Sequence, residues 1–75
     1  MEITKTLDAK GLACPMPIVK TKKAIDDVAS GEILEVQATD SGAKSDLAAW
    51  TKSSGHELVD TKEEDGVYTF YVKKG

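Results

Sequence analysis

The sequence predicts an α+β fold, a two-layer sandwich in which two helices pack on one face of a four-stranded mixed sheet. Three observations lead to this prediction. Segments that alternate with the period of a strand and segments with helical period follow one another in the order βαβαββ. Hydrophobic residues make up 40% of the chain, which is enough to cover one face of a sheet but not both. No repeat, low-complexity tract or linker interrupts the sequence, so residues 1–75 are expected to form a single domain.

The first strand and the first helix are expected in residues 2–8 and 15–29. Around Lys5, apolar residues alternate with threonines, which is typical of a strand, and the lysine indicates a weak or edge position in the sheet. Apolar and small residues at helical spacing then predict an amphipathic helix that ends at Gly31. The residues on its inner face are Ile18, Thr21, Ile25 and Val28.

The second strand and the second helix are expected in residues 32–39 and 43–54. Apolar and polar residues alternate along the strand, which predicts that one of its faces is buried. The turn before the helix contains Asp40 and Ser41, whose side-chain oxygens are candidate N-caps, and Gly55 ends the helix. The apolar face of this strand contains Leu34, Val36 and Ala38, and the polar face contains Glu35 and Gln37.

Two further strands complete the chain, in residues 56–62 and 67–72. Tyr68, Phe70 and Val72 alternate along the last strand. The acidic and glycine residues at 64–66 predict a tight hairpin between the two strands.

The composition excludes several classes of function. The chain has 10 lysines, no arginine and 13 acidic residues, giving a net charge of −3, so we expect no nucleic-acid binding through bulk electrostatics. No apolar run reaches the roughly 18 residues of a membrane span, and we expect no membrane insertion. With one cysteine and one histidine there is no internal disulfide and no zinc site, and we expect no metal and no cofactor. We expect a cytoplasmic monomer.

The tetrapeptide Cys14-Pro15-Met16-Pro17 stands where the first helix begins. Proline is tolerated in the first helical turn, so Pro15 suits the first helical position and places Cys14 as the N-cap. At that position the positive end of the helix dipole favours the thiolate of Cys14 over its thiol. Because Pro15 and Pro17 have no N–H, Met16 is the expected hydrogen-bond donor to the sulfur. The two prolines also stiffen the turn that exposes Cys14.

A lone cysteine in a small domain is more often a buried hydrophobic residue than a reactive group. The flanking prolines reverse that expectation here. A buried cysteine does not require a proline on either side of the next residue, and neither Ala13 nor Pro15 continues an apolar periodicity that would draw Cys14 inward. Cys14 is therefore the candidate nucleophile.

The segment from Leu7 to Pro17, which contains the Cys-Pro-x-Pro motif, resembles the signature of the TusA/SirA-like sulfur-carrier family. The likeness continues through residues 39–43 and 55–58, with Asp46 and Trp50 between them, and so covers nearly the whole chain. The resemblance implies a two-layer βαβαββ fold with strand order 1-2-4-3 and an antiparallel last strand.

The resemblance also implies a function for Cys14. In this family the motif cysteine accepts sulfur as a persulfide from a desulfurase or rhodanese-like donor and hands it to an acceptor protein. This is a sulfurtransferase-type half-reaction without a cofactor of its own. Members of the family serve tRNA thiolation, molybdenum cofactor assembly, sulfur oxidation or thiosulfate uptake, and the sequence does not select among these pathways.

Other charged residues are weaker candidates for the site. Lys44 is the nearest candidate cation to stabilise a thiolate or persulfide, with a solvated surface lysine as the alternative. His56 begins a strand parallel to the first two and belongs at the opposite sheet edge, so we expect a structural role at the end of the second helix. Lys20, Lys22 and Lys23 form either a solvated helix face or a docking patch for an acidic partner.

Two alternatives to the sulfur carrier remain open. The first is a regulatory or assembly module that uses the same surface for docking and in which Cys14 carries no sulfur. The second is a thiol redox adaptor, which is less favoured because a lone cysteine has no resolving partner.

Overall fold

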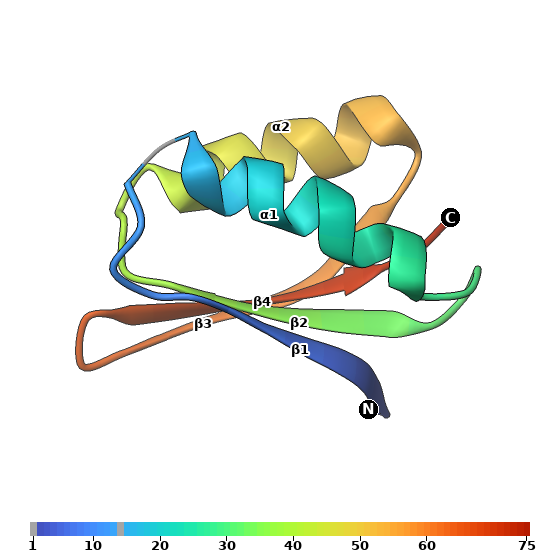
Figure 1. Ribbon diagram of the computed structural model, residues 1–75, viewed down its shortest axis with the longest axis horizontal. Coiled ribbons are helices and arrows are strands. Elements are labelled where there is room, and N and C mark those ends of the chain that lie inside the picture. The colour runs from blue at the N-terminus through green and yellow to red at the C-terminus, as the bar shows by residue number, and fades with distance from the viewer. Residues whose placement is uncertain (1, 14) are drawn as a thin grey trace.

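Four strands and two α-helices form two layers in the computed structural model, which describes residues 2–13 and 15–75 (Figure 1). Both helices lie on the same face of the sheet (Figure 1). The elements are β1 (Ile3–Ala9), α1 (Met16–Ala24), a 3₁₀ turn (Ile25–Asp27), β2 (Ile33–Ala38), α2 (Ala43–Ser54), β3 (Glu57–Glu64) and β4 (Val67–Lys73).

The strands lie in the order β1-β2-β4-β3. β1 pairs with β2 in parallel, and β4 pairs antiparallel with both β2 and β3. Since β4 is antiparallel to each of its neighbours, β3 runs parallel to β1 and β2. The mixed sheet with two helices on one face is the architecture that the sequence predicts, and the strand order is the one implied by the family resemblance.

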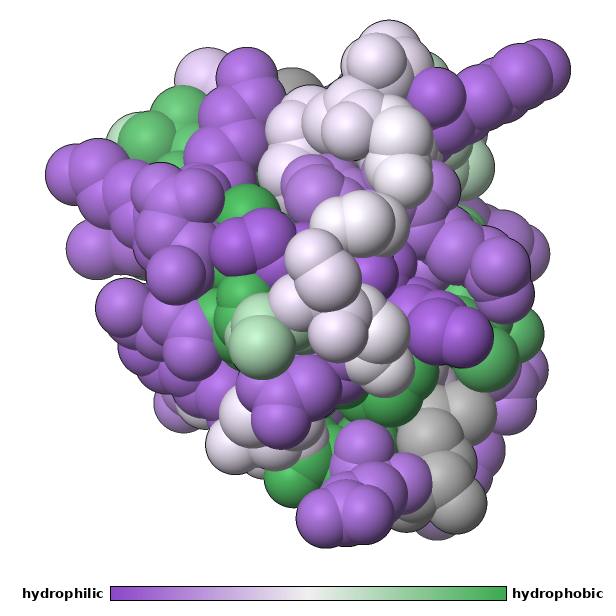
Figure 2. All heavy atoms as spheres, turned by 90° about the vertical axis from the view of Figure 1, so that its right-hand side faces the viewer, coloured by the Kyte–Doolittle hydropathy of each residue, from purple (hydrophilic) through white to green (hydrophobic). Residues whose placement is uncertain are grey.

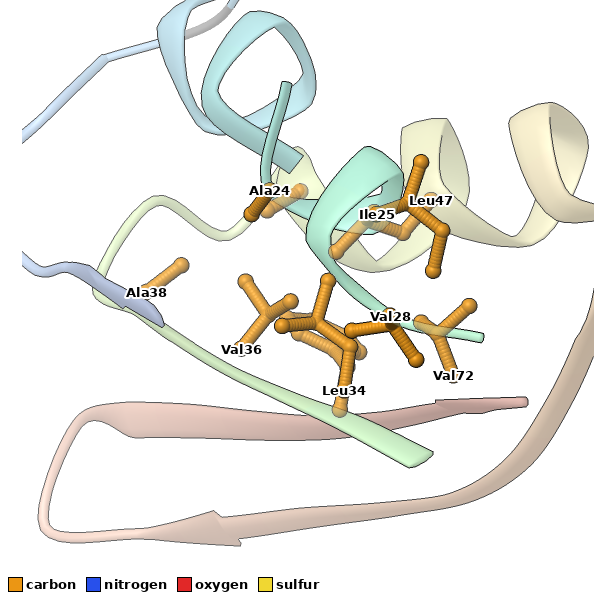
Figure 3. Packing of buried hydrophobic residues seen from close by; sticks show 10 residues of the cluster. Ala24, Ile25, Val28, Leu34, Val36, Ala38, Leu47 and Val72 are labelled. Atoms are coloured by element: carbon orange, nitrogen blue, oxygen red, sulfur yellow. The ribbon is translucent and has the colours of Figure 1, made fainter. Parts of the chain in front are cut away.

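The core lies between the sheet and the helices, where apolar side chains from both layers meet (Figure 3). Leu34, Val36 and Ala38 of β2 are fully buried, which confirms the apolar face predicted for this strand. Leu47 of α2 and Phe70 of β4 are also fully buried. The other buried members of the cluster are Ala24, Ile25, Val28, Ala43 and Val72.

The first helix is shorter than the predicted 15–29. α1 ends at Ala24 and continues as the 3₁₀ turn, whose last bond runs from the Val28 N–H to the Ile25 carbonyl oxygen at 3.1 Å. Residues three apart lie on the same side of a 3₁₀ helix. This tighter winding allows Ile25 and Val28 both to face the core, where each is at most 4% exposed.

The β3–β4 hairpin turns through Asp65 and Gly66, as predicted for residues 64–66. Both residues have positive φ angles, 52° for Asp65 and 79° for Gly66, which is the backbone of a type I′ turn. β3 begins at Glu57, one residue later than expected, because the His56 N–H donates to the Thr51 carbonyl oxygen at 2.9 Å and so belongs to the end of α2.

β1 is an edge strand, as the lysine within it indicates. Lys5 reaches across to the 3₁₀ turn, and its Nζ lies 2.5 Å from Oδ2 of Asp27. The hydrogen bond from Lys5 and the positive charge of its ammonium lower the pKa of the Asp27 carboxyl below its ordinary value. This ion pair connects the sheet edge to the end of the first helical segment.

In Lys5→Met, we expect the pKa of Asp27 to rise back toward its ordinary value, as measured by NMR titration of its carboxyl carbon. Because the folded-state pKa is lowered, the ion pair stabilises the fold above the ordinary carboxyl pKa, and this contribution is lost as the pH falls through the lowered value. Lys52→Met, which removes a lysine from α2, should leave the pKa of Asp27 unchanged. An equal Asp27 pKa in Lys5→Met and the wild type would contradict this account.

Candidate functional site

The three connections at one edge of the sheet form the candidate site. The β1–α1 connection, the β2–α2 turn and the β3–β4 hairpin all lie at the left of Figure 1. In a sheet with parallel strands, the carboxyl ends of these strands and the N-termini of the following helices share an edge. The turn at 40–44 and the hairpin at 64–66 thus lie at the same edge of the sheet, as predicted. Cys14 itself lies outside the described residues.

α1 begins one residue later than the sequence predicts. Pro15 is the N-cap, with φ −94° and ψ 10°, Met16 is the first helical residue and Pro17 the second. The N-cap position expected for Cys14 is therefore wrong by one residue, and Cys14 precedes the cap in the sequence. The fixed φ of proline suits either position, and the nonhelical ψ of Pro15 is what places it outside the helix.

The backbone N–H groups at the start of α1 are already engaged. The Met16 N–H donates to the Ala13 carbonyl oxygen at 2.9 Å, and the Ile18 and Val19 N–H groups both donate to the Pro15 carbonyl oxygen at 3.1 Å. Pro17 has no N–H to offer. The expectation that Met16 donates to the sulfur involves Cys14, which lies outside the described residues, and so stays a prediction. The positive end of the helix dipole also favours an anion at the start of α1.

A contact between two connections steadies the loop that leads to the motif. The Gly11 N–H donates to Oγ1 of Thr39, the residue that follows β2, at 2.9 Å. Gly11 has φ 81°, a left-handed conformation that suits glycine. The Leu12 N–H donates to the Ala9 carbonyl oxygen at 3.3 Å. Thr39 is thus a positioning residue that the sequence reasoning did not single out, although it lies in a segment that carries the family likeness.

The turn before α2 is held by Asp40 in a different way from the one predicted. The N-cap of α2 is Gly42, which makes no side-chain cap bond, so neither Asp40 nor Ser41 is the cap. Instead, Oδ1 of Asp40 accepts the Gly42 N–H at 3.1 Å, and its carbonyl oxygen accepts the Ala43 N–H at 3.0 Å. Asp40 therefore stabilises the turn that leads into α2 without being the N-cap of the helix.

Lys44 lies in the first turn of α2, and its side chain is exposed. It lines a shallow hollow with the side chains of Thr61 and Tyr68, over the buried ring of Phe70. The lysine is thus on the edge that carries the three connections, and a role in stabilising an anion there stays a prediction.

His56 follows the C-cap of α2 directly, as the sequence indicates, and this end of α2 lies opposite the three connections (Figure 1). Its Nδ1 accepts the Gly75 N–H at 3.0 Å, and its ring centroid is 5.2 Å from that of Trp50. The surface at that end of the molecule is mostly hydrophilic, and apolar residues show only as small separate patches (Figure 2). The hydrogen bond with Gly75 and the ring contact with Trp50 give His56 a structural role away from the site edge.

Neither α1 nor α2 has the length and apolar composition that a helix needs to cross a membrane.

Comparisons with known proteins agree with this fold. Residues 5–74 match the family model described as Sulfurtransferase TusA. The Bacillus subtilis protein YrkI is 59% identical over 75 residues, 100% of both chains. The sulfur carrier protein TusA of Allochromatium vinosum is 44% identical over 73 residues, 97% of this chain and 96% of its own. A crystal structure of a SirA-like protein from Desulfitobacterium hafniense superposes with a TM-score of 0.83 at 24% identity, covering 96% of this chain and 99% of that one, and shows the same fold. With nearly its whole length matched in this way, the chain belongs to the TusA sulfurtransferase family.

Proposed function

We propose that this protein is a sulfur carrier in which Cys14 accepts sulfur as a persulfide from a donor protein and passes it to an acceptor protein. The observation that carries the proposal is the family match over residues 5–74, which includes the only cysteine of the chain. A relative that is 44% identical along nearly its whole length is named a sulfur carrier. We place the exchange in the cytoplasm, where reducing conditions keep a thiol free.

The proposed chemistry is an exchange of one sulfur atom without net oxidation. The thiolate of Cys14 attacks the terminal sulfur of a donor persulfide, R–S–SH, and a new S–S bond forms. The S–S bond of the donor breaks, and its electron pair leaves with the donor thiolate, R–S⁻. Cys14 now carries the S–SH group. An acceptor thiolate then attacks that terminal sulfur, the S–S bond to Cys14 breaks, and the thiolate of Cys14 is released. Each step breaks one S–S bond and forms another, so no cofactor is needed.

Three features of the described residues support this chemistry. The positive end of α1 favours an anion close to the motif. Pro15 and Pro17 restrict the backbone on both sides of Met16, so little conformational entropy is lost when a partner docks. The hydrogen bond between Gly11 and Thr39 fixes the loop that precedes the motif. Lys44 is the proposed cation for a thiolate or persulfide at this edge.

The proposal is tested by incubating the purified chain with glutathione persulfide and measuring its intact mass. The wild-type chain should gain the mass of one sulfur atom and lose it on addition of dithiothreitol, since a thiol reduces the persulfide. Peptide mapping should locate the added sulfur on Cys14. If the wild type gains no reducible sulfur, the carrier function is wrong, and the docking module with an inert Cys14 becomes the better interpretation.

A further inference from the structure

The face of the sheet opposite the helices is open, since both helices lie on the other face (Figure 1). Side chains alternate between the two faces of a strand, so the residues between the buried positions of β2 and β4 point away from the core. Glu35 and Gln37 of β2 and Tyr71 of β4 are on this open face, and each is half-buried. The molecule therefore has a second surface, apart from the three connections at the sheet edge.

A hollow of about 360 Å³ crosses the open face. It is lined by residues of all four strands, which are Ile3, Glu35, Asp60, Lys62 and Tyr71. In the register of the sheet, Tyr71 stands between Glu35 on β2 and Asp60 on β3. Residues directly opposite each other in an antiparallel pair have Cβ atoms about 4.5–5.5 Å apart. The ring of Tyr71 therefore has a carboxylate-bearing neighbour on each side.

Neutral donors orient the two carboxylates. Nε2 of Gln37 donates to Oε1 of Glu35 at 3.0 Å, and the Thr61 N–H donates to Oδ1 of Asp60 at 2.8 Å. Among the residues that the structure describes, no ion pair involves either carboxylate. Both negative charges are thus available to a cation from another molecule.

Lys62 shows that the ring of Tyr71 attracts a cation. Its Nζ lies 5.6 Å from the ring centroid, within the range of a cation–π interaction. Lys62 is opposite Thr69, one row along the sheet, so its side chain reaches the ring diagonally. An arginine suits the whole arrangement better than a lysine, because its flat guanidinium both stacks on aromatic rings and binds carboxylates through paired N–H groups.

The charge of the open face favours a basic partner. The strand residues that point to this side include five carboxylates and two lysines, an excess of three negative charges; they are Asp8, Glu35, Glu57, Asp60 and Glu64, with Lys62 and Lys73. This charge repels nucleic acid and anionic membrane surfaces. Two copies of the face would place carboxylates against carboxylates. A positively charged segment of another protein is the occupant that complements it.

We propose that the open face of the sheet binds an arginine-rich segment of a partner protein, with one guanidinium on the Tyr71 ring between the carboxylates of Glu35 and Asp60. Glu35 is three residues before the end of β2, so the hollow lies roughly 10 Å back from the sheet edge that follows this strand. A partner held here leaves the three connections uncovered. Binding needs no sulfur on Cys14, and the inference therefore goes beyond the proposed carrier function.

The test uses a fluorescein-labelled peptide of alternating arginine and serine, with a peptide of alternating glutamate and serine as its counterpart. At low salt, fluorescence anisotropy should show that the basic peptide binds about tenfold more tightly or better. At 1 M salt, where the screening length is about 3 Å, most of this preference should disappear. In ¹⁵N-labelled protein, the basic peptide should shift the backbone NMR signals of Glu35, Asp60 and Tyr71.

Two variants remove the flanking charges. Glu35→Gln and Asp60→Asn should each weaken binding of the basic peptide by about threefold. Glu63→Gln is the matched control, because it removes a carboxylate from the same strand as Asp60 at a position opposite Tyr68, on the helix side of the sheet. Its affinity should stay within about twofold of the wild type. Urea unfolding curves check that each variant is folded.

A third variant separates the ring from overall charge. Lys62→Met removes the cation that competes for the Tyr71 ring and should tighten binding of the basic peptide by about threefold. Lys52→Met removes the same charge from α2 and should change the affinity much less. Equal effects of the two variants would mean that overall charge alone attracts the peptide, which would overturn the proposed site.

The other outcomes are equally decisive. Equal affinity for the basic and acidic peptides, or NMR shifts confined to the helices, would overturn the open-face site. Shifts of the same signals with protein concentration, in the absence of peptide, would also overturn it, since they would identify a second copy of the chain as the occupant. Cys14→Ser should bind the basic peptide as the wild type does, so a failure of this site is distinguishable from a failure of the carrier function.

Discussion

Cys14→Ser is expected to abolish both the uptake of sulfur from glutathione persulfide and its transfer to an acceptor thiol. The serine hydroxyl is not ionised near neutral pH and is a much poorer nucleophile than a thiolate, and its oxygen forms no stable equivalent of a persulfide. Intact-mass analysis should show no added sulfur, and a radiolabel from ³⁵S-labelled persulfide should not reach the acceptor.

The control for this variant is its stability. A urea midpoint equal to that of the wild type would show that the loss is chemical and not structural. A Cys14→Ser chain that still complements a deletion strain would favour the alternative in which the protein docks and Cys14 carries no sulfur.

Phe70→Ala is expected to lower the free energy of unfolding by about 3–5 kcal/mol, the largest effect we expect from a single core substitution. Phe70 is fully buried in β4, an inner strand of the sheet, and its ring packs near that of Tyr68 with centroids 6.5 Å apart. Because small domains have a total stability of roughly 5 kcal/mol at the lower end, the variant should be partly unfolded at room temperature.

Urea unfolding followed by circular dichroism measures this effect, with Val59→Ala as the control. Val59 is 39% exposed at an irregularity of the edge strand β3, so its truncation should change the free energy of unfolding by no more than about 0.5 kcal/mol. Comparable losses in the two variants would mean that Phe70 is not at the centre of the core.

Elements whose ends are marked by local chemistry could be predicted closely from the sequence. α2 runs from Ala43 to Ser54, as expected, because Gly55 takes the left-handed conformation, φ 80°, that ends a helix. The hairpin was also predictable, since an Asp-Gly pair between two alternating segments favours a type I′ turn. In these places a short-range signal and the final structure agree.

The details of the site depend on interactions that no local pattern reveals. The start of α1 was misplaced by one residue because proline fits both positions, and only the ψ angle of Pro15 separates them. The cap of α2 was misassigned because the Asp40 carboxylate binds the Gly42 N–H instead of a helical N–H. The bond from Gly11 to Thr39 joins residues 28 apart in sequence, and the pairing of their connections appears only once β1 and β2 are side by side.

In the proposed sulfur carrier, the start of α1 bears on how easily sulfur would leave Cys14. Among the described residues, the Met16 N–H donates to the Ala13 carbonyl oxygen and Pro17 has no N–H, so the attraction that these residues offer an anion comes mainly from the helix dipole. Such attraction depends weakly on whether the negative charge is on a thiolate or one sulfur further out. If Cys14 carries sulfur as we propose, a turn built this way would stabilise the empty and the loaded forms to a similar extent, and the equilibrium constant for exchange with a similar thiol would stay near one. A relay needs this balance, because any intermediate that held the persulfide much more tightly than its neighbours would retain the sulfur instead of passing it on.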